Sequence, residues 1–146
     1  MTAFSLGEAL LGDLGTPTKG FWYVASPYSA ERASSRMTIQ SNRYWRAIDA
    51  LAILHKAGYS VFSPIVHWHM VSVTRINVMA ADKSCDWNDF NRPFLEACCG
   101  VIVVCLEGWR ESVGVTWEFE EMRRMGKPIK YMWNENRLPV AEPPPL

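Results

Sequence analysis

Residues 100–118 read GVIVVCLEGWRESVGVTWE, and this stretch decides the fold. It opens with a nearly continuous apolar, β-branched run over residues 100–106, which is typical of a strand covered on both faces of a parallel sheet. A short polar turn follows. From Ser112 onward the apolar residues recur with the period of an amphipathic helix. The stretch therefore predicts a strand, a turn and a helix in immediate succession, which is the building block of α/β proteins.

The start of this helix is also the most informative feature for function. Ser112 and Gly114 stand at the predicted N-terminus, and Glu118 follows within the second turn. The first backbone N–H groups of a helix have no intrahelical partner, and the helix dipole adds partial positive charge, so such an end attracts anions. A carboxylate beside it is a candidate nucleophile or base. Together these features favour a site for a small phosphorylated or sugar-bearing molecule.

Strand and helix patterns alternate through the rest of the chain. The predicted strands are residues 21–25, 59–64, 100–106 and 129–132, and the predicted helices are residues 37–57, 87–98 and 112–125. Residues 65–85 are ambiguous and favour a helix only over residues 70–80. This alternation predicts an α/β, Rossmann-like three-layer sandwich with a four- to five-stranded parallel sheet. We expect a flexible arm at residues 1–19, one domain at residues 20–133 and a proline-rich tail at residues 134–146.

Composition excludes several classes of function. The 146 residues suit a single domain, and 15 basic residues balance 15 acidic ones. Without a basic surface, we expect neither a nucleic acid polymer nor an anionic membrane as a partner. No signal peptide or apolar stretch of about 18 residues is evident. Cysteines at 85, 98, 99 and 105 form no disulfide framework, so the expected location is a reducing cytoplasm.

A second group of candidate residues follows the first predicted strand. Ser26, Pro27 and Tyr28 come directly after it, and Tyr23 lies within it. In parallel sheets the loops after the strands meet at one edge, where ligands bind, so this loop and the loop of residues 106–112 should open onto the same edge. Ser26 and Tyr28 would line a pocket there, whereas a tyrosine placed like Tyr23 is more often core, and a proline placed like Pro27 more often shapes the turn than contacts a ligand. Arg43, in the first helix, could reach the same edge or could be an ordinary surface arginine.

The phase of the last helix bears on Glu118. Val115 lies three residues before it and Met122 four residues after it, so Glu118 is on or beside the apolar stripe. A glutamate facing a core is unfavourable unless it is paired or lies in a polar cleft. A flanking surface position remains the alternative. Ser112 likewise has a purely structural alternative as a helix N-cap, and Gly114 as part of a tight turn.

No metal or other cofactor is predicted. His67 and His69, two residues apart, would lie on one side of an extended segment and could bind zinc, but a third ligand is not apparent. Asp89 precedes the third strand and could be a catalytic acid or only a helix cap.

Several motifs resemble one enzyme superfamily. They are Ser112-x-Gly114-Val115-x-x-Glu118, GKPI at residues 126–129 and YVASPYS at residues 23–29. In their order and spacing they resemble the nucleoside 2-deoxyribosyltransferase superfamily, and within it the branch containing 2-deoxynucleoside 5-phosphate N-hydrolase. AGYSVFSPI at residues 57–65, and Gly108-Trp109 ahead of Ser112, resemble the domain family DUF1937 more closely still. The resemblance covers residues 20–132.

The resemblance implies a flavodoxin-like fold and a retaining glycosyl transfer without a cofactor. The glutamate matching Glu118 attacks the anomeric carbon of a nucleoside or nucleotide, the base leaves after protonation, and water or a second base completes the reaction. The serine matching Ser112 holds a 5′-phosphate, and Gly108, Trp109 and Gly114 would lie beside the ligand. Members are usually oligomers that complete the site from a neighbour, which implies a homo-oligomer here, a dimer or tetramer.

Two positions depart from the family pattern. Asn91 stands where the family usually has an aspartate, and Cys99 stands where it often has another acidic residue. Asparagine can orient a base through hydrogen bonds but cannot protonate it. Asp89 could replace that acid only if the helix start is shifted.

Three hypotheses follow. The first is an N-glycosidase or deoxyribosyltransferase-like enzyme in which Glu118 is the nucleophile and Asp89 or Asn91 engages the base or sugar. The second is a non-catalytic nucleotide-binding module on the same fold, which the departures favour. The third is an interaction protein that uses its aromatic residues between 65 and 90 to oligomerise.

Overall fold

The computed structural model describes residues 19–29, 36–75, 87–133 and 137–146. Within these residues, four strands form one parallel sheet in the order β2-β1-β3-β4. The strands are β1 (Trp22–Ala25), β2 (Val61–Phe62), β3 (Gly100–Val104) and β4 (Ile129–Met132). The order reverses between β1 and β3, and the register there pairs Ala25 with Val103. The predicted strands are thus confirmed, although β2 is shorter than expected.

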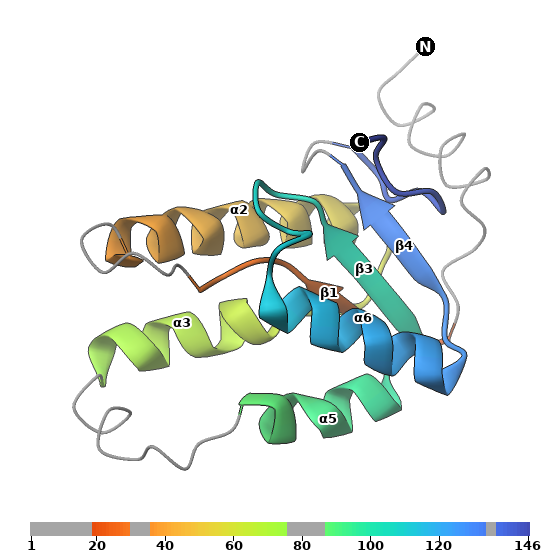
Figure 1. Ribbon diagram of the computed structural model, residues 1–146, viewed down its shortest axis with the longest axis horizontal. Helices are drawn as coiled ribbons and strands as arrows, with labels where there is room; N and C mark the ends of the chain where they lie inside the picture. Colours follow the sequence, from red (N-terminus) through yellow and green to blue (C-terminus); the bar gives the residue numbers. More distant parts are fainter. Residues whose placement is uncertain (1–18, 30–35, 76–86, 134–136) are drawn as a thin grey trace.

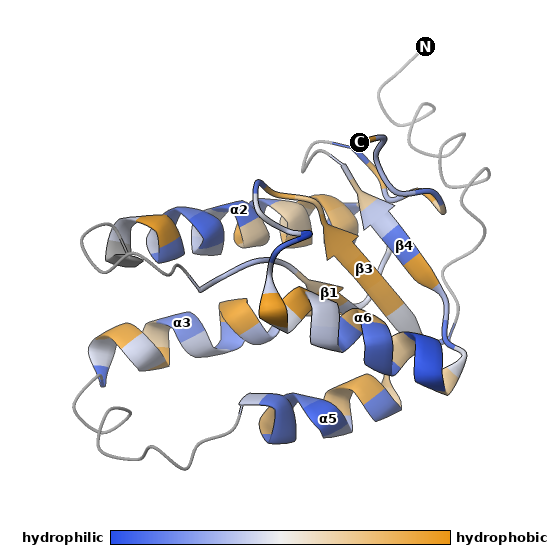
Figure 2. Cartoon of the chain, viewed as in Figure 1, coloured by the Kyte–Doolittle hydropathy of each residue, from blue (hydrophilic) through white to orange (hydrophobic). Residues whose placement is uncertain are grey.

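Helices cover both faces of the sheet, as Figure 1 shows. They are α2 (Arg36–Lys56), α3 (Pro64–Thr74), α5 (Trp87–Ala97) and α6 (Val113–Met125). One core cluster joins Leu54 of α2 to Ile102 and Val104, and the other joins Leu95 of α5 and Met122 of α6 to Val101 and Val103. All five residues of β3 are buried, and β3 is correspondingly apolar in Figure 2. The predicted α/β three-layer fold is confirmed.

Helix α3 corrects one sequence prediction. It begins at Pro64, whereas the sequence favoured a helix from Met70. Ser63 is its N-cap and accepts a hydrogen bond from the backbone N–H of Val66 at 3.3 Å, and proline suits the first helical position because it has no N–H to satisfy. The Ser-Pro pair therefore begins a helix as well as ending the strand.

The same correction bears on the histidine pair that was weighed as a zinc site. His67 and His69 lie on a helix, where two positions turn through about 200°, and not on one side of an extended segment. His69 is buried, whereas His67 is exposed. Within the described part of the chain, no group of three His, Cys, Asp or Glu side chains is placed to hold a metal ion.

The C-terminal tail returns to the sheet. Tyr131 of β4 and Val140 exchange two backbone hydrogen bonds of 2.7 and 2.8 Å in an antiparallel bridge. The indole Nε1 of Trp133 donates to the carbonyl oxygen of Glu142 at 2.8 Å. The predicted arm falls outside the described residues apart from Lys19. Among the helices described, none has the length and apolarity needed to cross a bilayer.

Candidate functional site

Helix α6 buries one of its glutamates, Glu118, on the face that packs against the sheet. Ser112 caps the helix by accepting a hydrogen bond from the N–H of Val115 at 3.3 Å, and Gly126 ends it in a left-handed conformation, with φ 67°. Between these ends, Glu118 shares the buried stripe with Val115 and Met122. Its side chain is buried, with 7% of the residue's surface exposed. The phase predicted from the sequence is therefore the observed one.

Tyr23 is the partner of this carboxyl group. Its hydroxyl, on strand β1, donates to Oε1 of Glu118 at 3.1 Å. The other oxygen, Oε2, is buried and has no hydrogen-bond partner within the described structure. A buried oxygen without a partner is rare in folded proteins and calls for an explanation, such as a ligand or a catalytic role. The pair thus leaves one carboxyl oxygen without a hydrogen bond in the described structure.

Burial dominates the electrostatics of this pair. It raises the pKa of Glu118 to about 8, although the hydrogen bond from Tyr23 acts in the opposite direction. The pKa of Tyr23 is also raised, first by burial and then by the neighbouring carboxylate. The phenol therefore stays protonated and remains a donor. With a pKa of about 8, the carboxyl group is mostly protonated at neutral pH and ionises in mildly alkaline solution, where its ionised form is poorly solvated.

Asn91 lies on the inner face of the neighbouring helix. The side chain is buried on α5, and its Oδ1 has no hydrogen-bond partner within the described structure. Leu95, one turn further along the same face, packs in the core cluster that contains Tyr23. Asn91 therefore faces the interior between α5, α6 and β1.

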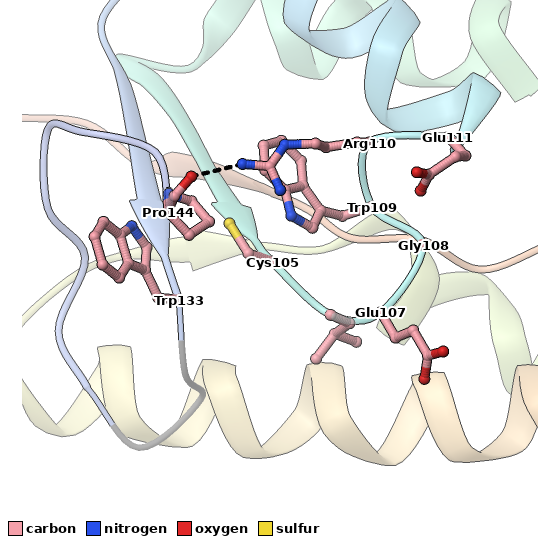
Figure 3. A pocket seen from close by; sticks show the side chains of 9 residues that line it. Cys105, Glu107, Gly108, Trp109, Arg110, Glu111, Trp133 and Pro144 are labelled. Atoms are coloured by element: carbon pink, nitrogen blue, oxygen red, sulfur yellow. Dashed lines mark hydrogen bonds between the residues drawn. The ribbon is translucent and has the colours of Figure 1, made fainter. Parts of the chain in front are cut away.

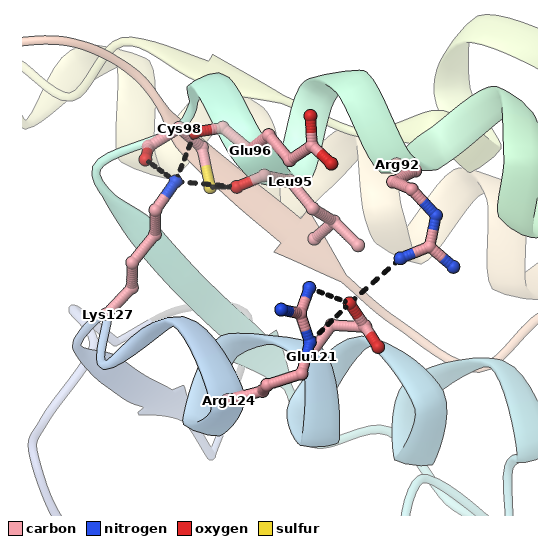
Figure 4. A network of polar contacts seen from close by, with 7 residues as sticks. All are labelled: Arg92, Leu95, Glu96, Cys98, Glu121, Arg124 and Lys127. Carbon is pink, nitrogen blue, oxygen red and sulfur yellow. Dashed lines mark hydrogen bonds and ion pairs between the residues drawn. The ribbon is translucent and has the colours of Figure 1, made fainter.

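Contacts between α5 and α6 fall on both sides of Glu118 along the helix. The guanidinium of Arg92 pairs with Glu121 at 3.0 Å and lies over the ring of Trp117, 5.3 Å from its centroid. Figure 4 shows this arginine reaching from α5 to α6. Asp89, by contrast, is exposed and lies about 200° around α5 from Asn91. Of the two predicted residues on α5, Asn91 is the one that faces the interior with Glu118.

Arg43 connects the two loops at the carboxyl edge. Its guanidinium donates to the carbonyl oxygen of Ser29 at 2.6 Å, and to that of Glu107 at 3.3 Å. These carbonyls belong to the loops after β1 and β3, so the two loops lie at the same edge, as predicted. Gly108 has a φ of 84°, and a Cβ there would lie 3.0 Å from Nη2 of Arg43. Arg43 holds the loops together across the point where the strand order reverses.

The loop after β1 is held against α3. Pro27 and Ser26 are buried, and the Oγ of Ser26 has no hydrogen-bond partner within the described structure. The hydroxyl of Tyr28 lies 2.7 Å from Nδ1 of His69, and the ring of Tyr44 stacks on His69 at 4.1 Å between centroids. Burial lowers the pKa of His69. Sequence reasoning missed this role of His69, and the Ser63-Pro64 cap was the signal that could have placed it on a helix.

The predicted residues around the start of α6 separate into two groups. Val113, next to Ser112, is 84% exposed, and a Cβ on Gly114 would meet nothing closer than 4.0 Å. Trp109 lies elsewhere: it packs 6.0 Å from the ring of Tyr131, and Arg110 lies over it. The helix start is thus open to solvent, whereas Trp109 belongs to the packing of the tail.

Two hollows lie on this tail side. One, of about 330 Å³, is lined by Trp109, Arg110, Trp133 and Pro144 among others, and Figure 3 shows Arg110 bonded across it to the carbonyl of Pro144. The other, of about 580 Å³, lies between Phe119 of α6 and the tail. Neither is lined by Tyr23, Asn91 or Glu118. Packing of the tail against β4 and α6 accounts for both hollows.

An aromatic cluster adjoins the buried pair. Phe62 lies 5.9 Å from Tyr23 and stacks on Phe94 of α5 at 4.2 Å between centroids. Beyond Phe94, the cluster continues to Phe90, on which His67 stacks at 5.8 Å. The cluster joins α3 to α5 and gives the interior near Tyr23 an aromatic wall.

Comparison with known families gives one match. The profile of a domain of unknown function, DUF1937, matches residues 20–135, which include every strand and helix described above. A search of curated proteins found no match. Because the matched region covers most of the chain, the chain belongs to the DUF1937 family.

Proposed function

We propose that the protein cleaves the N-glycosidic bond of a nucleoside or nucleotide, with Glu118 as the nucleophile. The observation that carries this proposal is the buried pair in which Tyr23 occupies one carboxyl oxygen of Glu118 and leaves the other without a partner. The resemblance of Ser112-x-Gly114-Val115-x-x-Glu118 to nucleoside 2-deoxyribosyltransferases also supports it.

The reaction has two steps. In the first, Oε2 of ionised Glu118 bonds to the anomeric carbon while the bond from that carbon to the base breaks. In the second, water or another base attacks the same carbon and releases the carboxylate. Tyr23 holds Oε1 and so orients the attacking oxygen.

The remaining predicted residues have supporting roles. The exposed start of α6, with Ser112 and Gly114, would bind a 5′-phosphate through its unpaired N–H groups. Ser26 has an unpartnered hydroxyl near the carboxyl edge and would contact the sugar. Asn91 would contact the base, and Arg43 would keep both loops in place.

A panel of nucleosides and nucleoside monophosphates tests the proposal. Wild-type protein should release free base from at least one member, as measured by chromatography, and Glu118→Gln should not. Glu120→Gln is the matched control, because Glu120 is exposed on the same helix. Absence of turnover on the whole panel would count against a glycosidase.

The second candidate is a nucleotide-binding module without catalysis. The burial of Glu118 favours it, because a ligand must displace what covers the carboxyl group to reach it. Nucleotides would then raise the melting temperature without any release of base. Loss of that shift in a Ser112 variant would place the ligand at the start of α6.

We also propose that the protein assembles as a homo-oligomer in the cytoplasm. Met70, Val73 and Trp87 are large apolar residues exposed on α3 and α5, and α3 contains no Asp, Glu, Lys or Arg. The cysteines described, Cys98, Cys99 and Cys105, are free thiols, as suits a reducing compartment. Light scattering after size exclusion should give a mass of two or four chains, and a monomer would contradict the assembly.

A further inference from the structure

We propose that the substrate is a nucleotide whose base is already positively charged, such as a pyridinium or an N7-alkylated purine. This inference rests on the proposed function and names its substrate class. The evidence is the set of carboxyl groups and proton donors that the described residues place near Glu118.

A single buried carboxyl group is present in the described residues. Glu118 is buried, whereas the other glutamates and aspartates described there are exposed, with the exception of Glu121. Glu121 is held by two arginines, Arg92 at 3.0 Å and Arg124 at 2.7 Å. On the neighbouring helix α5, the amide of Asn91 is buried, and its Oδ1 has no hydrogen-bond partner in the described structure. Among the described residues, the site thus contains one candidate nucleophile and no second carboxyl group.

This arrangement selects among leaving groups. When the bond to a neutral base breaks, the electron pair stays on the ring nitrogen, and the departing anion needs a proton from a nearby acid. When the base is cationic, the same electron pair cancels the positive charge, and a neutral molecule leaves without a proton. Water then adds to the anomeric carbon, Glu118 departs as carboxylate, and one proton goes to solvent. Atoms and charges therefore balance with water as the only co-reactant.

The carboxyl group itself also suits a cation. Phe62 lies 5.9 Å from Tyr23 but stacks face to face on Phe94, at 4.2 Å between centroids, so the carboxylate itself, and not an aromatic face, would attract the positive charge. A cation beside Glu118 would favour the ionised carboxylate that the reaction needs. Arg92, the basic residue nearest in sequence to Asn91, is already paired with Glu121.

Other proton donors in this region have different partners or positions. Cys98 donates to the carbonyl oxygen of Leu95 at 3.1 Å, and burial raises its pKa. His69 is engaged with Tyr28 and Tyr44. His67, stacked on Phe90 at the exposed end of the aromatic cluster, is the donor that an experiment must exclude.

Two purine nucleotides that differ by one methyl group provide the test. Release of 7-methylguanine from 7-methylguanosine 5′-monophosphate is compared with release of guanine from guanosine 5′-monophosphate, and nicotinamide mononucleotide is a second cationic probe. Each rate is corrected with Glu118→Gln, which measures spontaneous loss. We expect both cationic probes to be cleaved at least a hundredfold above that background and guanosine 5′-monophosphate not to exceed it. Asn91→Asp should introduce an acid and raise guanine release at least tenfold.

The outcomes separate the two proposals. If wild-type protein releases guanine above background, the cationic-base inference is overturned while the proposed function stands. Loss of that release in His67→Gln would then identify the acid that serves neutral bases. If none of the three nucleotides is cleaved above background, the inference is overturned, and release of base from any other member of the panel would leave the proposed function intact.

Discussion

The two sides of helix α6 differ in how their polar groups are satisfied. On the tail side, Arg110 donates to the carbonyl of Pro144, and Trp133 donates to the carbonyl of Glu142. On the side facing α5 and the sheet, Oε2 of Glu118 and Oδ1 of Asn91 are buried without a partner. The two hollows described above lie on the first side, and these two unpartnered atoms lie on the second.

This difference shows which observation indicates function. A buried polar atom without a partner destabilises the fold by about 1–3 kcal/mol. Two other such atoms in the described residues, Trp22 Nε1 and Tyr59 Oη, belong to neutral groups in the core, whereas Glu118 is the one carboxyl group in the set. A hollow under a folded-back tail, in contrast, follows from the shape of a proline-rich segment. The proposed function therefore rests on the side of α6 that faces α5 and the sheet. If the two sides differ in function, changes on that side should affect turnover and changes on the tail side should not.

The largest effect is expected on turnover. Glu118→Gln should lower the rate of base release by about a thousandfold or more, as removal of other enzymatic nucleophiles does, while Glu120→Gln should leave it within twofold. A steady-state assay on the best substrate of the panel measures both. An equal loss of the rate of base release in Glu118→Gln and Glu120→Gln would show that Glu118 has no special role in turnover.

The pH dependence of stability should report the same carboxyl group. The pKa of Glu118 is about 8 in the folded protein, against 4.5 for an ordinary glutamate. The folded state therefore binds the extra proton between these values, and its stability falls as pH rises from about 4.5 to 8. The change is on the order of a few kcal/mol. Denaturant unfolding at several pH values should show this slope in wild type and its loss in Glu118→Gln; identical slopes would contradict the burial of the carboxyl group.

Lys127 should stabilise the α5 side. Its ammonium donates to the carbonyl oxygens of Leu95, Glu96 and Cys98 at the end of α5, at 2.7, 2.5 and 2.7 Å, as Figure 4 shows. Lys127→Met leaves these carbonyls without their charged donor and should destabilise the protein by about 2–3 kcal/mol. Lys56→Met is the control, because Lys56 is exposed. Chemical denaturation distinguishes the two, and a Lys127 variant as stable as the control would show that these three hydrogen bonds do not stabilise the protein.

Removal of the tail should have the smallest effect. Deletion of residues 140–146 removes the pairing of Val140 with Tyr131 and the bonds to Trp133 and Arg110. We expect a loss of about 1–2 kcal/mol in unfolding free energy and no change in base release beyond twofold. If the truncated protein loses turnover while it remains folded, the tail side takes part in function, and function is not confined to the side of α6 that faces α5.

Sequence reasoning predicted the elements whose signals are local. The apolar run of β3, the Ser112 cap of α6 and the glycine at 126 each determine their own structure within a few residues. Helix α3 was misplaced because Ser63-Pro64 was interpreted only as the end of a strand. That error also placed His67 and His69 on one side of an extended segment.

The site was predictable only in part, because its contacts join distant segments. Helical phase alone placed Glu118 toward the interior. Its bond to Tyr23 spans 95 residues and depends on the packing of α6 against β1, which no local pattern encodes. The position of Trp109 on the tail side likewise depends on where the chain returns after β4.

Covalent trapping tests the central role of Glu118 most directly. A 2′-deoxy-2′-fluoro analogue of the best substrate slows the second step, so the sugar phosphate should remain attached to the protein. Mass spectrometry of the intact chain should show one added sugar phosphate, mapped by proteolysis to the peptide that contains Glu118 and absent from Glu118→Gln. Release of base by Glu118→Gln at the wild-type rate, with no adduct on wild-type protein, would contradict Glu118 as the nucleophile.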